Sequence, residues 1–159
     1  MIDRDCTLRD STAADREFLQ TVYAESRAHE LAAVDWTDDQ KAEFCRQQFD
    51  AQDAHYREHY PDCRFLVVEC GGEPVGRLYV DRRPDEIRVV DIALRIAARG
   101  RGLGGRLMRE VMDEAAAAEL PVRIHVERTN PARRLYDRLG FVLEQEGEVY
   151  DRLVWKKSV

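Results

Sequence analysis

The stretch VDIALRIAARGRGLGGRL, residues 90–107, determines how the rest of the chain is interpreted. Its first residues are typical of a strand, and they lead into a glycine-rich turn and then into a helix. The first N–H groups of a helix have no intrahelical partner, and the helix dipole adds partial positive charge at that end. A strand, a glycine-rich turn and a helix start, in this order, therefore predict an anion-binding site.

The composition of the turn favours a pyrophosphate as the anion. Glycines stand at positions 100, 102, 104 and 105. Because these residues lack Cβ atoms, a phosphate oxygen can approach the backbone closely. Cationic side chains flank the turn at Arg99, Arg101 and Arg106.

Three classes of glycine-rich loop bind such an anion. A Walker A loop ends in Gly-Lys-Ser/Thr, whereas this loop ends in Gly-Gly-Arg, which excludes that class. A dinucleotide-binding loop has the pattern G-x-G-x-x-G, and Gly100–Gly105 matches it. The match comes late in the chain, however, and the acidic residue near the required spacing, Glu119, falls at a predicted helix end instead of a strand end. The third class binds coenzyme A, whose nucleotide carries a pyrophosphate.

Periodicity and turn residues divide the remaining sequence into strands and helices. In chain order we expect strand 7–9, helix 12–28, helix 37–59, strand 65–68, strand 74–80, strand 86–94, helix 102–119, strand 122–126, a helix opened by Asn130 and Pro131, strand 141–143 and strand 149–155. This order predicts a mixed sheet with helices on its faces, in the α/β (α+β) class.

Two segments resemble the GCN5-related N-acetyltransferase (GNAT) superfamily. The loop is similar to the family's motif A, Gln/Arg-x-x-Gly-x-Gly/Ala, with Arg99, Gly102 and Gly104 at its defined positions. The segment NPARRLYDRLGF, residues 130–141, resembles the family's C-terminal motif. The resemblance implies a GNAT-like, mostly antiparallel sheet of about six or seven strands flanked by about four helices. We expect residues 1–159 to form a single domain, because no repeat or linker interrupts them.

The resemblance also implies site residues by position. The pyrophosphate-binding amides belong to Arg99, Gly100, Arg101, Gly102, Leu103, Gly104 and Gly105. Strand residues Ile92, Ala93 and Leu94 pair with the pantetheine arm, and Asn130 contacts the coenzyme. Tyr136 protonates the departing thiolate.

Attack of an amine on a thioester also needs a group that accepts the amine's proton. The strand before the loop offers Asp91 and Glu86, and its position favours Asp91 as the catalytic base or amine-binding carboxylate. The alternative is an ion pair between Asp91 and a nearby arginine such as Arg88 or Arg77. Alternatives also remain for the other two positions: Tyr136 as a core aromatic residue, and Asn130 as a helix cap alone.

These residues together predict an acetyl-CoA-dependent N-acetyltransferase that acts by direct attack in a ternary complex. The expected acceptor is the primary amine of a small molecule or peptide, and no metal is expected. A second hypothesis is a non-catalytic acyl-CoA-binding or sensor module on the same fold. The presence of Tyr136 and Asp91 argues against the sensor. The resemblance to the family is compatible with a homodimer, but no feature of this sequence tests the oligomeric state.

The bulk composition excludes several other classes. A net charge of −6 argues against a general nucleic-acid binder. No apolar run approaches the roughly 18 residues of a membrane span, and residues 1–6 lack the apolar core of a secretory signal. We therefore expect a cytoplasmic protein. We also expect all four cysteines, Cys6, Cys45, Cys63 and Cys70, to be reduced, mostly buried thiols, because their spacings match no CxxC pair and no common zinc pattern.

Overall fold

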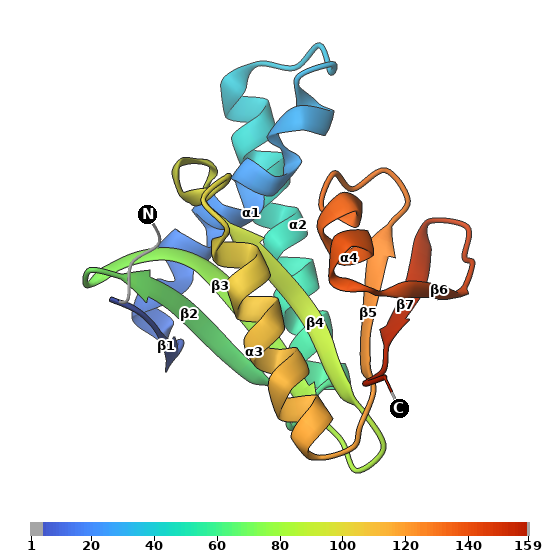
Figure 1. Ribbon diagram of the computed structural model, residues 1–159. Coiled ribbons are helices and arrows are strands. Elements are labelled where there is room, and N and C mark those ends of the chain that lie inside the picture. The colour runs from blue at the N-terminus through green and yellow to red at the C-terminus, as the bar shows by residue number, and fades with distance from the viewer. Residues whose placement is uncertain (1–4, 159) are drawn as a thin grey trace.

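The structure is a computed structural model that describes residues 5–158. These residues form four α-helices and a seven-stranded sheet with the order β1-β2-β3-β4-β5-β7-β6 (Figure 1). The elements are β1 (Cys6–Asp10), α1 (Arg16–Leu31), α2 (Asp38–His59), β2 (Arg64–Cys70), β3 (Glu73–Arg82), β4 (Ile87–Leu94), α3 (Leu103–Ala117), β5 (Val122–Glu127), α4 (Arg133–Leu139), β6 (Val142–Gln145) and β7 (Tyr150–Trp155). Short 3-10 turns cover Ala13–Asp15 and Ile96–Ala98.

The predicted mixed, mostly antiparallel sheet is confirmed. Strands β4 and β5 run parallel, and the other neighbouring pairs of the described sheet run antiparallel. A parallel pair needs a crossover connection, which α3 supplies. This crossover brings the start of α3 to the end of β4, where the glycine-rich loop lies.

The helices cover both faces of the sheet. Figure 1 shows α3 across the front of the sheet and α2 behind it. The predicted apolar face of α3 is buried: Leu103, Leu107, Met108, Val111, Met112 and Ala115. On β3, Leu78 and Val80 belong to the core cluster that contains this helix face. The alternate residues Arg77 and Tyr79 instead contact Gln52 and Tyr56 of α2.

The two N-terminal helices pack against each other through a smaller apolar cluster that includes Leu19, Tyr23 and Phe49. The predicted capping box of α2 is present: the Thr37 hydroxyl accepts from Gln40 N at 3.1 Å, and Thr37 N donates to the Gln40 side chain at 2.9 Å. The sequence therefore predicted the start of α2 correctly.

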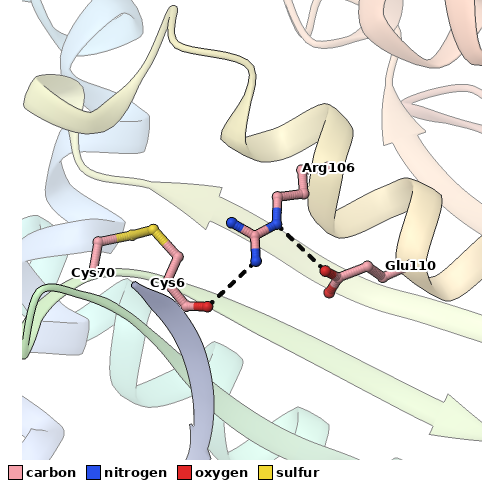
Figure 2. The surroundings of a disulfide bond; sticks show 4 residues. All are labelled: Cys6, Cys70, Arg106 and Glu110. Atoms are coloured by element: carbon pink, nitrogen blue, oxygen red, sulfur yellow. Dashed lines mark hydrogen bonds and ion pairs between the residues drawn. A yellow bond between two sulfur atoms is a disulfide. The ribbon is translucent and has the colours of Figure 1, made fainter. Parts of the chain in front are cut away.

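The expectation that all four cysteines are reduced was wrong for one pair. Cys6 and Cys70 form a disulfide between β1 and β2 (Figure 2), and Cys45 and Cys63 are free and buried. The antiparallel register places Cys6 directly opposite Cys70, although 64 positions separate them in sequence. The spacing of the cysteines could not reveal this pairing because it depends on strand register.

Helix α4 begins later than expected. The sequence predicted that Asn130 caps it and Pro131 is its first residue, whereas the helix begins at Arg133. Asn130 caps a preceding turn instead: its Oδ1 accepts from Ala132 N at 2.9 Å. Asn and Asp side chains often bond to the backbone two residues onward, which allows a turn before the helix.

Candidate active site

The sheet opens between β4 and β5. Their pairing covers Ile87–Val89 of β4 and Val122–Ile124 of β5 and then stops. On the outer side of each strand, pairing continues, to Leu94 between β3 and β4 and to Glu127 between β5 and β7. The two halves of the sheet therefore diverge after Val89, as the ribbon shows (Figure 1). The edge of β4 that faces this opening can pair with an extended ligand.

A β-bulge marks the point where the strands diverge. Tyr79 of β3 lies opposite Asp91, and the next residue, Val80, lies opposite Val89. Val90 is therefore the extra residue of β4. Bulges bend a strand and re-aim its groups, and they are common beside active sites. Here the bulge directs the last residues of β4 along the opening.

The glycine-rich loop has the backbone conformation that an anion site needs. Gly100 and Gly102 have φ angles of +76° and +80°, which residues with a Cβ atom rarely adopt. Gly102 is the N-cap of α3 and supplies no side-chain cap, so the first amides of the helix remain available. The amides at the start of α3 therefore remain as donors, whereas the N–H of Arg99, which the sequence also predicted to bind the anion, already donates to Ile96 O at 3.1 Å.

The second glycine pair, Gly104 and Gly105, lies in the first turn of α3 and faces α4. A Cβ atom on Gly104 or Gly105 would lie 3.5 Å from the side chain of Leu135 on α4. Such a distance is ordinary van der Waals contact, so α4 packs beside the start of α3 without requiring glycine at these positions. The loop is therefore bordered by a second helix.

The three arginines around the loop are not equivalent. Arg99 and Arg101 are exposed, and Arg99 Nε donates to Leu94 O at 3.1 Å. Arg106 instead reaches β1, where its guanidinium donates to Cys6 O at 3.5 Å and pairs with Glu110 (Figure 2). The positive charge of Arg106, which the sequence analysis assigned to the loop, therefore also links α3 to β1.

Tyr136 on α4 is almost completely buried, at 3% exposure, and its ring packs on Phe141 with centroids 6.0 Å apart. Arg133, at the start of the same helix, donates to the buried Asp151 of β7 at 3.0 Å and fixes the helix on the sheet. Burial raises the pKa of the Tyr136 phenol, and the negative charge of Asp91 raises this pKa further. The phenol therefore keeps its proton at neutral pH, and the ring belongs to the main core cluster, as the core-aromatic alternative predicted.

Asp91 lies directly after the bulge, with 19% of its side chain exposed. It forms an ion pair with Arg77, so the ion-pair alternative for Asp91 is correct for this arginine. Arg88, the other arginine that the sequence suggested, pairs with Glu86 at 3.1 Å. The pairing does not exclude a catalytic role, because part of the carboxylate is still exposed.

The far wall of the site contains groups that the sequence indicated only weakly. One of them is Tyr56 of α2. Burial raises the pKa of its phenol, and the charge of Asp91 raises this pKa further. Arg27 of α1 pairs with Glu127 at the end of β5, at 3.2 Å. Neither contact has a sequence signal, because each joins elements far apart in the chain.

The structure therefore brings most of the predicted residues to one region. Ile92, Ala93 and Leu94 lie on the β4 edge, the loop follows them, and the charge of Asp91 reaches Tyr136. Asn130 lies in the turn after β5 and is exposed. In the described part of the chain, no group of His, Cys, Asp and Glu side chains could hold a metal ion. No helix of residues 5–158 has both the length and the apolar character needed to cross a membrane.

Solved structures with the same fold include several acetyltransferases. PaiA N-acetyltransferase from Thermoplasma acidophilum, in complex with coenzyme A, has 16% identity and a TM-score of 0.73, with 96% of this chain and 99% of that one covered. An acetyltransferase from Thermus thermophilus has 21% identity and a TM-score of 0.70, with 99% and 100% covered. Spermidine N-acetyltransferase from Vibrio cholerae, in complex with CoA and spermine, has 19% identity and a TM-score of 0.64, with 97% and 96% covered.

No curated protein sequence matches the chain significantly. The sequence model of the acetyltransferase (GNAT) family, in contrast, matches residues 19–141. This match spans most of the chain and includes the loop, both strands of the opening and Tyr136. The chain therefore belongs to the acetyltransferase (GNAT) family.

Proposed function

We propose that the protein is an N-acetyltransferase that moves an acetyl group from acetyl-CoA to a primary amine in a ternary complex. The family uses acetyl-CoA. The observation that carries the proposal is the opening between β4 and β5: Asp91 lies on the open part of β4, the glycine-rich loop follows this strand, and Tyr136 lies on α4, which packs beside the start of α3. One extended thioester can contact all of these groups at once.

The donor is held mainly by backbone groups. The amides of residues 100–105 bind the pyrophosphate, since Gly100 and Gly102 give the loop its conformation and the helix dipole favours negative charge. The open edge of Ile92–Leu94 pairs with the amides of the pantetheine arm. Asn130 contacts the coenzyme from the turn before α4.

The transfer needs no covalent enzyme intermediate. Asp91 binds the acceptor amine and accepts its proton, directly or through water. The amine nitrogen forms the bond to the acetyl carbon, and an N–H of the bulged strand donates to the oxyanion. The bond from carbon to sulfur then breaks, and Tyr136 gives its proton to the thiolate. The proton lost by the amine replaces the one lost by Tyr136, so the products are an acetamide and the free thiol.

Neighbouring structures support an amine as the acceptor. The Vibrio cholerae protein is a spermidine N-acetyltransferase that was solved with spermine, and it has the same fold. In this chain, the diverging parts of β4 and β5 carry the carboxylates of Asp91 and Glu127, and the charge of Asp91 acts on the phenol of Tyr56 on α2. Such groups hydrogen-bond an amine or ammonium group.

The direct test is incubation with acetyl-CoA and a panel of primary amines, namely polyamines, amino acids and peptides, with release of free thiol as the readout. We expect turnover with at least one amine, and mass spectrometry should find the acetylated product. Tight coenzyme A binding without turnover on any acceptor would contradict the proposal and favour the acyl-CoA sensor.

The loop gives a second test. We expect Gly102→Val to raise the Kd for acetyl-CoA about 30-fold, because a β-branched residue at positive φ is strained and the loop amides must move to relieve it. The measurement is calorimetric titration. Gly72→Val is the matched control: its φ is +82°, it lies in the turn between β2 and β3, and a Cβ there meets no atom within 4 Å. An equal Kd for both variants would show that the loop does not bind the coenzyme.

A further inference from the structure

The guanidinium of Arg77 is buried beneath α2, beside the proposed site of transfer. Its side chain is 3% exposed. One nitrogen, Nη2, donates to Asp91 Oδ2 on β4 and to Gln52 Oε1 on α2, the latter at 2.8 Å. The guanidinium carbon also lies 4.9 Å from the centre of the Tyr79 ring. Arg77 thus connects three elements at the wall of the opening.

Stability alone is a weak reason for this arrangement. Removing a cation from water is unfavourable, and the attraction to a carboxylate offsets this only when the geometry is good. A well-packed apolar side chain at such a position often leaves a protein equally stable. Most of the chain's other arginine–carboxylate pairs among the described residues are much more exposed. The burial of this pair beside the proposed site of transfer therefore indicates a role in that site and not only in stability.

The two oxygens of Asp91 have different surroundings. Oδ2 accepts from Arg77, and among residues 5–158 Arg77 is the only hydrogen-bond donor to this carboxylate. Oδ1 therefore remains for another donor, and the side chain is partly exposed. Because Arg77 is itself fixed by Gln52 and the Tyr79 ring, it holds the carboxylate in one orientation.

We infer that Arg77 is a positioning residue for acetyl transfer: it holds Asp91 through Oδ2, so that Oδ1 faces the acceptor amine. This inference rests on the proposed function, because it acts through the role of Asp91 there. The hydrogen bond from Arg77 to Gln52 also connects α2 to the acceptor side of the site.

The test is a double-mutant cycle with Arg77→Met and Asp91→Asn, measured as kcat/KM for the acceptor. We expect Arg77→Met to lower kcat/KM about 30-fold, because small displacements of a catalytic group have large kinetic effects. The Kd for acetyl-CoA should change less than about twofold, since Arg77 lies on the acceptor side of the site. Arg77→Lys, which keeps the positive charge near Asp91, should recover part of the loss.

The Asp91→Asn background distinguishes positioning from a structural role. If Arg77 acts through Asp91, then Arg77→Met should lower kcat/KM in that background by less than about threefold. If the wild type is active and the double variant shows the product of the two single-variant losses in kcat/KM, the inference is overturned and the proposed function stands. A wild-type protein without turnover would overturn both. If Arg77→Met does not fold, the same cycle with Arg77→Lys gives the answer.

Arg88→Met is the matched control for lost stability. Arg88 is 15% exposed and pairs with Glu86, whose side chain is 8% exposed, at the opposite end of β4. Its replacement also leaves a buried carboxylate without this partner, so the melting temperature should fall. We expect kcat/KM to stay within about twofold of wild type because the pair lies away from the opening. An equal kinetic loss in both variants would show that Arg77 acts only through stability.

Discussion

Tyr136→Phe is expected to lower kcat about 100-fold while leaving the Kd for acetyl-CoA within about twofold, because general acid catalysis typically contributes 10²–10⁴-fold. The substitution removes one oxygen and keeps the ring, which packs on Phe141 in the core. The fold should therefore be preserved. Burial and the charge of Asp91 both raise the pKa of this phenol, so it is protonated at neutral pH; the raised pKa makes it a weaker acid, so the acid role rests on the kinetic result and not on this shift.

The comparison needs both a kinetic and a binding measurement. Thiol release under saturating substrates reports kcat, and calorimetric titration with coenzyme A reports binding. Tyr60→Phe is the matched control, because Tyr60 follows α2 and contacts Tyr56 and Arg83, away from α4. Unchanged kcat in Tyr136→Phe would assign the proton to another donor. An equal loss in both variants would indicate a general effect of removing phenols.

Local patterns in the sequence were sufficient to predict the helices and turns on the coenzyme side of the site. The apolar positions of α3 recur at helical spacing, and the glycines before it need no knowledge of distant residues. The segment 130–141 likewise carries its own turn and helix signals. Only the first residue of α4 was misplaced, because the Asn130 side chain can cap a turn as well as a helix.

Contacts between distant elements could not be predicted in this way. Asp91 was assigned from its position on β4, but its sequence neighbours do not identify Arg77 as the partner over Arg88. That choice follows from the register of β3 and β4 and the bulge at Val90, which place Arg77 and Asp91 on the same face. Register depends on long-range pairing, and a shift of one residue would reverse every side chain.

The acceptor side is the least predictable part for the same reason. Its wall combines α1, α2, β5 and β7, and contacts such as Arg27 with Glu127 span 100 positions. The two motifs that carry the family resemblance, residues 99–104 and 130–141, lie outside α1 and α2. Identification of the acceptor therefore depends on the amine panel and on the Arg77 cycle.

Reduction of the Cys6–Cys70 disulfide is expected to lower the free energy of unfolding by about 4 kcal/mol, from the chain-entropy model for a loop of this length. The bond joins residues 64 positions apart, so it removes many conformations from the unfolded chain. It also holds β1, an edge strand that pairs only with β2 in the described sheet. For a domain of this size, the melting temperature should fall by about 10 °C.

Thermal melts with and without a dithiol reductant test this expectation. The double variant Cys6→Ala/Cys70→Ala should melt close to the reduced wild type and should not respond to the reductant. Cys45→Ala is the control, because this thiol is free and its loss should not abolish the response. Equal melting of oxidised and reduced wild type would show that pairing with β2 alone holds β1. In that case the link from Arg106 to Cys6 O, which joins β1 to the helix of the anion-binding loop, would also persist without the disulfide.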